Sequence, residues 1–173
     1  PRRFAIISDI HGNSHALTAV LDLIDRMEIR TIVCLGDVVG YGAFPNECCE
    51  TLRFRRIPTI AGNHDHAALD KTDIKFFNDV AKASVQWTRE RLSRENAEWL
   101  AGLPFTHQVE DCLFVHATPH QPERWGYVMT FGDARQCFTE FSQRFCFVGH
   151  SHQPAIVEQL GEDGAGLGRV DDH

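Results

Sequence analysis

The sequence has no run of apolar residues approaching 18 in length, so we expect no membrane-spanning helix. Its first residues reach Asp9 too early to contain the apolar centre of a secretory signal peptide. Glycine and proline are also scarce, with 13 and 7 among 173 residues, and this excludes collagen-like and low-complexity chains. A chain of this length is expected to form one domain with a substantial core.

Basic residues and paired cysteines are scarce as well. The chain carries 17 Lys and Arg against 24 Asp and Glu, so its formal net charge is −7. This balance argues against a broad surface for nucleic acid or anionic lipid. The six cysteines include no Cys-x-x-Cys pair, and Cys34, Cys112 and Cys146 lie inside apolar runs. We therefore expect reduced thiols and a cytoplasmic protein.

Short apolar runs alternate with amphipathic segments, which indicates the α/β class. Strands are predicted at residues 4–8, 31–35, 57–60, 105–109, 112–115, 145–148 and 155–160. Helices are predicted from a cap at Asn13 or Ser14 to about Met27, at 45–54, within 74–100 as two helices broken near Ser93, and at 132–143. We expect one domain over residues 1–160 and an irregular tail over 161–173, where four glycines and four acids replace any apolar period.

Polar side chains follow five of the predicted strands. They are Asp9 and His11, Asp37, Asn63 and His64, His116, and His150 and His152. In open α/β sheets the carboxyl ends of the strands frame the ligand crevice. Taken alone, each of these groups of residues could equally be a plain turn, a helix cap or a histidine of the core. Five repetitions of the pattern favour one metal site at the edge of the sheet over five unrelated turns.

The types of donor indicate which metals fit. Two carboxylates, one amide oxygen and four imidazoles are mixed oxygen and nitrogen ligands, suited to Mn, Fe, Ni or Zn rather than to Ca or Mg alone. Seven donors exceed the four ligands of a structural zinc site. The sequence therefore favours a cofactor of two divalent transition metal ions with open coordination positions.

The order of these motifs resembles the calcineurin-like metallophosphoesterase superfamily. The segment Gly36-Asp37-Val38-Val39-Gly40-Tyr41-Gly42, followed by Pro45-Asn46-Glu47, resembles its small bacterial and archaeal phosphodiesterase branch. The resemblance covers residues 4 to about 157. It implies a four-layer α/β/β/α sandwich of two mixed sheets flanked by helices, with the site on loops at the upper edge.

The resemblance also implies a role for each site residue. Asp9, His11 and His152 would bind one metal, Asn63, His116 and His150 the other, and Asp37 would bridge both. His64 would bind no metal and would act as general acid, while a metal-bridged hydroxide attacks a small or nucleotide-like phosphoester. A phosphodiesterase is the expected activity. Asn13 and His15 open the first helix beside the site and are candidate substrate contacts, with plain helix capping as the alternative.

The chain also departs from its family. In the phosphoprotein phosphatase branch an Asp-Arg pair follows the Gly-Asp motif, whereas this chain has Gly40-Tyr41, which argues against a Ser/Thr protein phosphatase. Relatives continue past the Gly-His-x-His motif with more strands, so we expect the C-terminal sheet to be incomplete. A partner chain, such as a second copy forming a homo-oligomer, could cover the exposed edge. The alternative function is a metal-binding scaffold that lacks turnover because the C-terminal part is missing.

Overall fold

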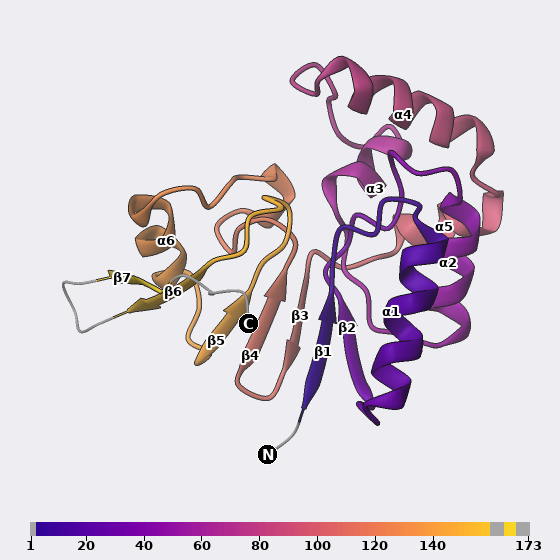
Figure 1. Ribbon diagram of the computed structural model, residues 1–173. Helices are drawn as coiled ribbons and strands as arrows, with labels where there is room; N and C mark the ends of the chain where they lie inside the picture. The colour runs from indigo at the N-terminus through magenta and orange to yellow at the C-terminus, as the bar shows by residue number, and fades with distance from the viewer. Residues whose placement is uncertain (1–2, 160–164, 169–173) are drawn as a thin grey trace.

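The computed structural model describes residues 3–159 and 165–168 and has a mixed α/β architecture (Figure 1). Strand β1 (Phe4–Ile7) pairs in parallel with β2 (Thr31–Cys34) in the first sheet. The second sheet has the order β3 (Thr106–Val109), β4 (Cys112–Val115) and β5 (Phe145–Phe147). In it, β3 is antiparallel to β4, and β4 is parallel to β5.

The strand register aligns the chain segments that carry the candidate ligands. Ile7 at the end of β1 lies opposite Cys34 at the end of β2, so the chain leaves both strands at the same edge. Strands β4 and β5 are likewise parallel, with Phe114 opposite Phe147. Figure 1 shows all four of these strands pointing upward. The loops that follow them therefore meet above the sheets.

Local signals place the helices that flank the first sheet. Helix α1 (Ser14–Arg26) is capped by Asn13, whose side chain accepts a hydrogen bond from Ala16 N. Helix α2 (Pro45–Phe54) begins with a proline, which needs no partner for an amide hydrogen there. These two helices agree with the sequence prediction.

The predicted break near Ser93 is also confirmed. Helix α4 (Asp79–Arg91) ends before it, and Ser93 caps helix α5 (Arg94–Ala101). Three shorter elements differ from the prediction. Helix α3 (Asn63–Ala68) and the 3₁₀ turn η1 (Pro122–Arg124) were not predicted, and α6 (Phe131–Phe138) ends earlier than residue 143.

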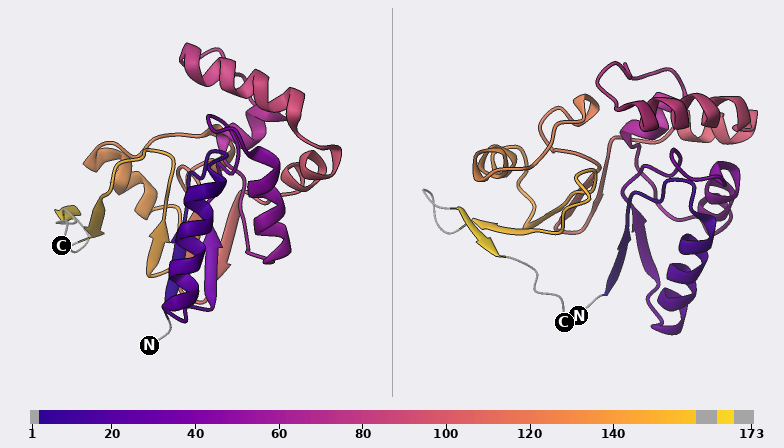
Figure 2. Two further views of the ribbon diagram at one scale, coloured as in Figure 1. Left: turned by 45° about the vertical axis from the view of Figure 1, so that its right-hand side comes forward. Right: turned by 45° about the horizontal axis from the view of Figure 1, so that its top comes forward.

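Two apolar clusters hold the layers together. In the first, Leu21 of α1, Leu52 of α2 and Leu100 of α5 pack with Ile32 and Cys34 of β2. In the second, Val33, Leu35 and Ile60 meet Phe114 of β4, so the two sheets pack face to face. Figure 1 and Figure 2 show helices α1, α2 and α5 beside the first sheet, α3 and α4 above its upper end, and α6 on the far side of the second sheet.

Two segments differ from the prediction. Residues 57–60 form only a bridge between Thr59 and Cys34, because Pro58 has no amide hydrogen to donate to a longer ladder. Within the tail predicted to be irregular, β7 (Ala165–Gly168) pairs antiparallel with β6 (Ile156–Gln159). The rest of the predicted tail lies outside the described residues, and the division at residue 160 stays a prediction.

The described helices include none that is long and apolar enough to cross a membrane. All six cysteines are free thiols. Cys34, Cys48 and Cys49 are buried, and burial raises the pKa of Cys48 to about 12. These three side chains therefore act as small core residues, as the sequence predicted for Cys34.

Candidate metal centre

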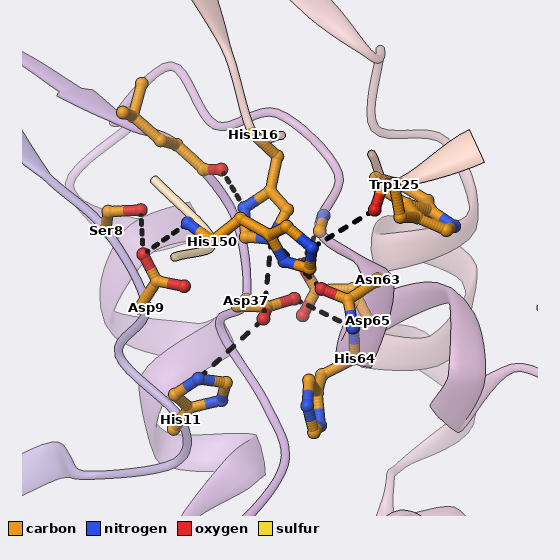
Figure 3. A network of polar contacts seen from close by, with 12 residues as sticks. Ser8, Asp9, His11, Asp37, Asn63, His64, Asp65, His116, Trp125 and His150 are labelled. Carbon is orange, nitrogen blue, oxygen red and sulfur yellow. Dashed lines mark hydrogen bonds and ion pairs between the residues drawn. The ribbon is translucent and has the colours of Figure 1, made fainter. Parts of the chain in front are cut away.

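Backbone hydrogen bonds join the loop after β1 to the loop after β2. Asp9 N donates to Gly36 O at 3.0 Å, and His11 N donates to Asp37 O at 2.9 Å. This parallel pairing continues the sheet into the two loops. It brings the side chains of Asp9, His11 and Asp37 to one place (Figure 3).

Two further hydrogen bonds connect the second sheet to this place. Gly149 N, just after β5, donates to His116 O at 2.8 Å, so the two histidine-bearing loops run together. His150 N donates to Asp9 Oδ2 at 3.2 Å and links the two sheets directly. Residues separated by 141 positions in the chain are therefore in contact.

The carboxylate of Asp37 lies at the centre of the arrangement and is 1% exposed. Its Oδ1 accepts a hydrogen bond from His64 N at 2.8 Å, and its Oδ2 lies 3.4 Å from His116 Nε2 and 3.7 Å from His11 Nε2. Burial would raise the pKa of Asp37, but the charges of His116, His64 and His11 hold that pKa far below its usual value. Asp37 is therefore a buried anion at neutral pH.

Three overlapping groups of potential metal ligands surround Asp37. In each group the ligand atoms lie within 4.8 Å of one another. The groups are Asp9, His11 and His152; His11, Asp37 and His64; and Asp37, His116 and His150. Asn63 joins the third group, because its Oδ1 lies 3.1 Å from His116 Nε2. The structure thus brings together all eight side chains that the strand ends predicted.

Backbone carbonyls orient three of the imidazoles. The contacts are His116 Nδ1 with Leu35 O at 2.8 Å, His11 Nδ1 with Val39 O at 3.2 Å, and His150 Nε2 with Trp125 O at 3.2 Å. Each of these ring nitrogens can donate its hydrogen to the carbonyl, which leaves the other nitrogen as a lone-pair donor. This is the arrangement that commonly supports histidine ligands of metals. The donor set therefore fits divalent cations.

Burial and charge shift the histidine pKa values in opposite directions. Burial would lower the pKa of His116, but the neighbouring Asp37 carboxylate outweighs it and raises that pKa to about 9. Burial lowers the pKa of His150 to about 4, and the charge of His116 adds to the effect. Without a cation, Asp37 and His116 therefore form a buried ion pair, and His150 is a neutral imidazole at pH 7.

His64 sits in a tight slot beside these groups. The residue is 5% exposed, and its Nδ1 is a buried atom with no hydrogen-bond partner among the described residues. Tyr41 and Phe77 lie against its ring at centroid distances of 4.7 and 4.9 Å. Burial lowers the pKa of His64 to about 4. A Cβ at Gly40 would lie 2.6 Å from Nδ1, so the slot requires glycine there.

Asp65 holds this region together and was not predicted to have that role. It is fully buried, and its carboxylate accepts hydrogen bonds from Val39 N at 3.1 Å and Gly62 N at 3.0 Å. Asp65 thereby fixes the start of α3 to the loop after β2. Burial and the nearby Asp37 charge raise the pKa of Asp65 to about 7. The available sequence signal was an acid three residues after Gly62, the position from which a side chain accepts a hydrogen bond from the N-cap amide in a capping box.

Trp125 was also missed. Besides its carbonyl contact with His150, its Nε1 donates to Thr72 Oγ1 at 3.0 Å, and its ring packs against His116 and His66. Its φ is +56°, which is unusual for a bulky residue. No local sequence pattern predicts these contacts of Trp125.

Five of the seven predicted metal ligands have left-handed backbone. The φ angles are +53° for Asp9, +50° for His11, +51° for Asp37, +65° for His150 and +53° for His152. Non-glycine residues in this region cost conformational energy and concentrate at functional sites. The concentration at one edge of the sheets marks this edge as the candidate site independently of side-chain chemistry.

The two predicted substrate contacts occupy other environments. Asn13 Oδ1 accepts the hydrogen bond that caps α1, as the alternative interpretation required. His15 is exposed and packs against Phe44 at a centroid distance of 5.0 Å. Neither contact joins them to the ligand groups around Asp37, and their substrate role stays a prediction. His152 lies at the rim, with its side chain 54% exposed.

Comparisons with known proteins agree on one family. A family model described as the calcineurin-like phosphoesterase superfamily domain matches residues 3–165. The chain is 39% identical over 161 residues to an uncharacterized protein of Methanocaldococcus jannaschii, and the match covers 91% of this chain and 65% of that protein. It spans less than two thirds of that relative's length.

Solved structures give the same result. A crystal structure of a metallophosphoesterase from Sphaerobacter thermophilus is 38% identical, has a TM-score of 0.74, and matches over 88% of this chain and 61% of that one. A hypothetical protein from Pyrococcus horikoshii OT3 shares the fold at 22% identity, with a TM-score of 0.72 and coverage of 84% and 68%.

Proposed function

Because the chain belongs to the calcineurin-like phosphoesterase superfamily, we propose that it is a phosphoesterase that uses two divalent metal ions. Its substrates would be small or nucleotide-like phosphodiesters. The observation that carries the proposal is the convergence of three overlapping ligand groups, two of which share the buried carboxylate of Asp37. A structural zinc site would need only four ligands and would leave no open position.

The ligands divide into two sets that share Asp37. In the proposal Asp9, His11 and His152 hold one ion, and Asn63, His116 and His150 hold the other. The position of Asp37 Oδ2 between His116 and His11 supports its shared role. Mixed imidazole and carboxylate donors favour Mn, Ni, Fe or Zn.

Bound cations would supply Lewis acidity toward the phosphoryl oxygens and a water of lowered pKa. The chain itself would supply the proton for the leaving group from His64. Its low pKa makes it neutral at pH 7 in the free protein, but a phosphoester anion beside the ring favours the protonated form. The aromatic walls of Tyr41 and Phe77 would hold the ring and exclude water.

The finer fold assignment is also a proposal. The helix cluster against the first sheet, the apolar cluster between the sheets, and α6 beyond the second sheet support a four-layer α/β/β/α sandwich. An incomplete C-terminal sheet, a homo-oligomeric partner and a cytoplasmic location stay predictions of the sequence.

Hydrolysis of bis(p-nitrophenyl) phosphate tests the function. Chelator-treated protein should be inactive, and added Mn or Ni should restore turnover. His64→Gln should cut turnover by about 10²- to 10⁴-fold, the usual contribution of a general acid, while metal content stays near two ions per chain.

Two outcomes would redirect the assignment. If His64→Gln loses metal, then His64 is a ligand within the group of His11 and Asp37. If the wild-type protein binds two ions but hydrolyses neither phosphodiesters nor phosphomonoesters, then the metal-binding scaffold is the better description.

A further inference from the structure

A cavity of about 190 Å³ adjoins the third ligand group and has no assigned role. Its walls come from the chain just after His116, including Thr118, and from the segment Arg124 to Tyr127. That same segment contains the carbonyl of Trp125 that contacts His150. The cavity is therefore built on the loop that follows one ligand of a proposed cation, His116, and this loop contacts a second ligand of that cation, His150.

Tyr127 separates this cavity from His150. The two rings are stacked at a centroid distance of 4.0 Å and an angle of 26°, so one face of the tyrosine covers the imidazole. Tyr127 is 56% exposed and also lines the cavity. The rest of its ring is therefore available to a ligand that lies in the cavity.

The charges that line the cavity favour a neutral polar group over a second phosphate. Arg124 and Asp133 contribute opposite charges. The carboxylate of Asp133 already accepts hydrogen bonds from Thr130 N at 2.8 Å and Met129 N at 3.0 Å. His120 contacts Glu140 at 2.8 Å. An additional anion would therefore meet no excess of positive charge.

The size of the cavity restricts the ligand further. Its volume of about 190 Å³ lies below the roughly 300–1,000 Å³ of sites for drug-sized molecules. A water molecule takes roughly 30 Å³ of the liquid, so the cavity has room for one small ring system. Hydrogen-bonding side chains such as Thr118 and Gln136 could then contact the polar edge of that ring.

We propose that this cavity binds the base of a nucleotide-type phosphoester, stacked on Tyr127, with the phosphate directed toward the ligand groups around Asp37. Aromatic stacking tolerates any base, because every base has a π face. The direction of the phosphate rests on the proposed function, whereas binding of the base does not.

Adenosine is the probe, because it has no phosphate and needs no metal. Ligand-observed NMR should detect contact of its base protons with the full chain, both with chelator and with Mn. Tyr127→Leu should weaken adenosine binding about tenfold, within the range for loss of one stacking partner. Gln136→Trp, made from an exposed position on α6, should weaken it by filling the cavity. Phe54→Leu, a change at an aromatic residue that is 89% exposed on α2, is the matched control and should have no effect.

Two results would overturn the proposal. One is wild-type protein that does not bind adenosine. The other is binding that survives both Tyr127→Leu and Gln136→Trp but falls with Tyr41→Leu, which would place the base on the His64 side. Hydrolysis of bis(p-nitrophenyl) phosphate in the same preparations separates the two proposals. Adenosine binding without hydrolysis would retain the cavity and reject the phosphoesterase, and hydrolysis without adenosine binding would do the reverse.

Discussion

Gly40→Ala tests the slot that holds His64 without replacing any potential ligand. Gly40 has φ of +92°, and an added Cβ would lie 2.6 Å from His64 Nδ1 and 3.1 Å from its Cβ and Cγ. The imidazole has little room to retreat, because Tyr41 and Phe77 close the slot. The methyl group should therefore move the ring away from the leaving group.

The expected magnitudes follow from these two effects. Alanine in left-handed backbone costs about 1–2 kcal/mol, and the displaced ring adds to this. A loss of about 2 kcal/mol should lower Tm by about 4–8 °C in a chain of this size. Turnover should fall by about 10²- to 10⁴-fold, as for loss of a general acid. Metal content should stay near that of the wild type, because the clash meets only His64.

The control is Gly102→Ala, where the nearest atom to an added Cβ is 3.6 Å away and φ is −94°. That variant should keep both Tm and turnover. The double variant Gly40→Ala with His64→Gln should be no slower than either single variant, because both remove the same group. Wild-type turnover in folded Gly40→Ala would refute the argument that the position of His64 matters.

Two more predictions concern the cations and the metal-free state. Asp37→Asn should weaken metal binding at both positions by more than about tenfold, since even a residue that only supports a ligand contributes that much. Asp9→Asn should weaken binding at one position only. Calorimetric titration with Mn measures both variants, and weaker binding at a single position in Asp37→Asn would disprove the shared ligand. In chelator, Tm should be highest near pH 6.5. The raised pKa of His116, about 9, means that its contribution is complete below pH 6.5 and is lost as pH rises through 9. The lowered pKa values of His64 and His150, about 4, mean that their contributions are complete above pH 6.5 and are lost as pH falls through 4. A Tm that rises steadily from pH 4 to 9 would contradict the buried pair of Asp37 and His116.

The sequence predicted those parts of the fold that depend on local signals. Asn13 and Ser93 indicate helix starts because the side-chain oxygen there accepts a hydrogen bond from a free backbone amide. Pro45 does so because it has no amide hydrogen to satisfy. The strand ends were also visible, since a buried run followed by Asp or His changes polarity abruptly. These signals were enough to identify Asn63 and all the side chains of the three ligand groups.

The missed features depend on contacts between distant segments. Helix α3 has six residues, too few for a helical period, so Asn63 to Asp65 resembled a turn. The role of Asp65 requires the amide of Val39, which lies 26 positions away. Trp125 orients His150 through its backbone carbonyl, and any residue type has that group. Such contacts exist only once the sheets are packed.

Five of the predicted ligands have left-handed backbone, and hydrogen bonds between the loops, as well as to the sheets, hold them in that conformation. Each such residue costs about 1 kcal/mol or more, so the loops would relax if each stood alone. The bonds from His11 N to Asp37 O and from Gly12 N to Val38 O hold the first two loops in register. The bond from His150 N to Asp9 Oδ2 adds the third. Because Asp9 and His150 belong to different proposed cation sites, a distortion of one site is transmitted to the other through this bond. The two proposed cations should therefore bind with coupled affinities even in Asp37→Asn, where the shared carboxylate is replaced.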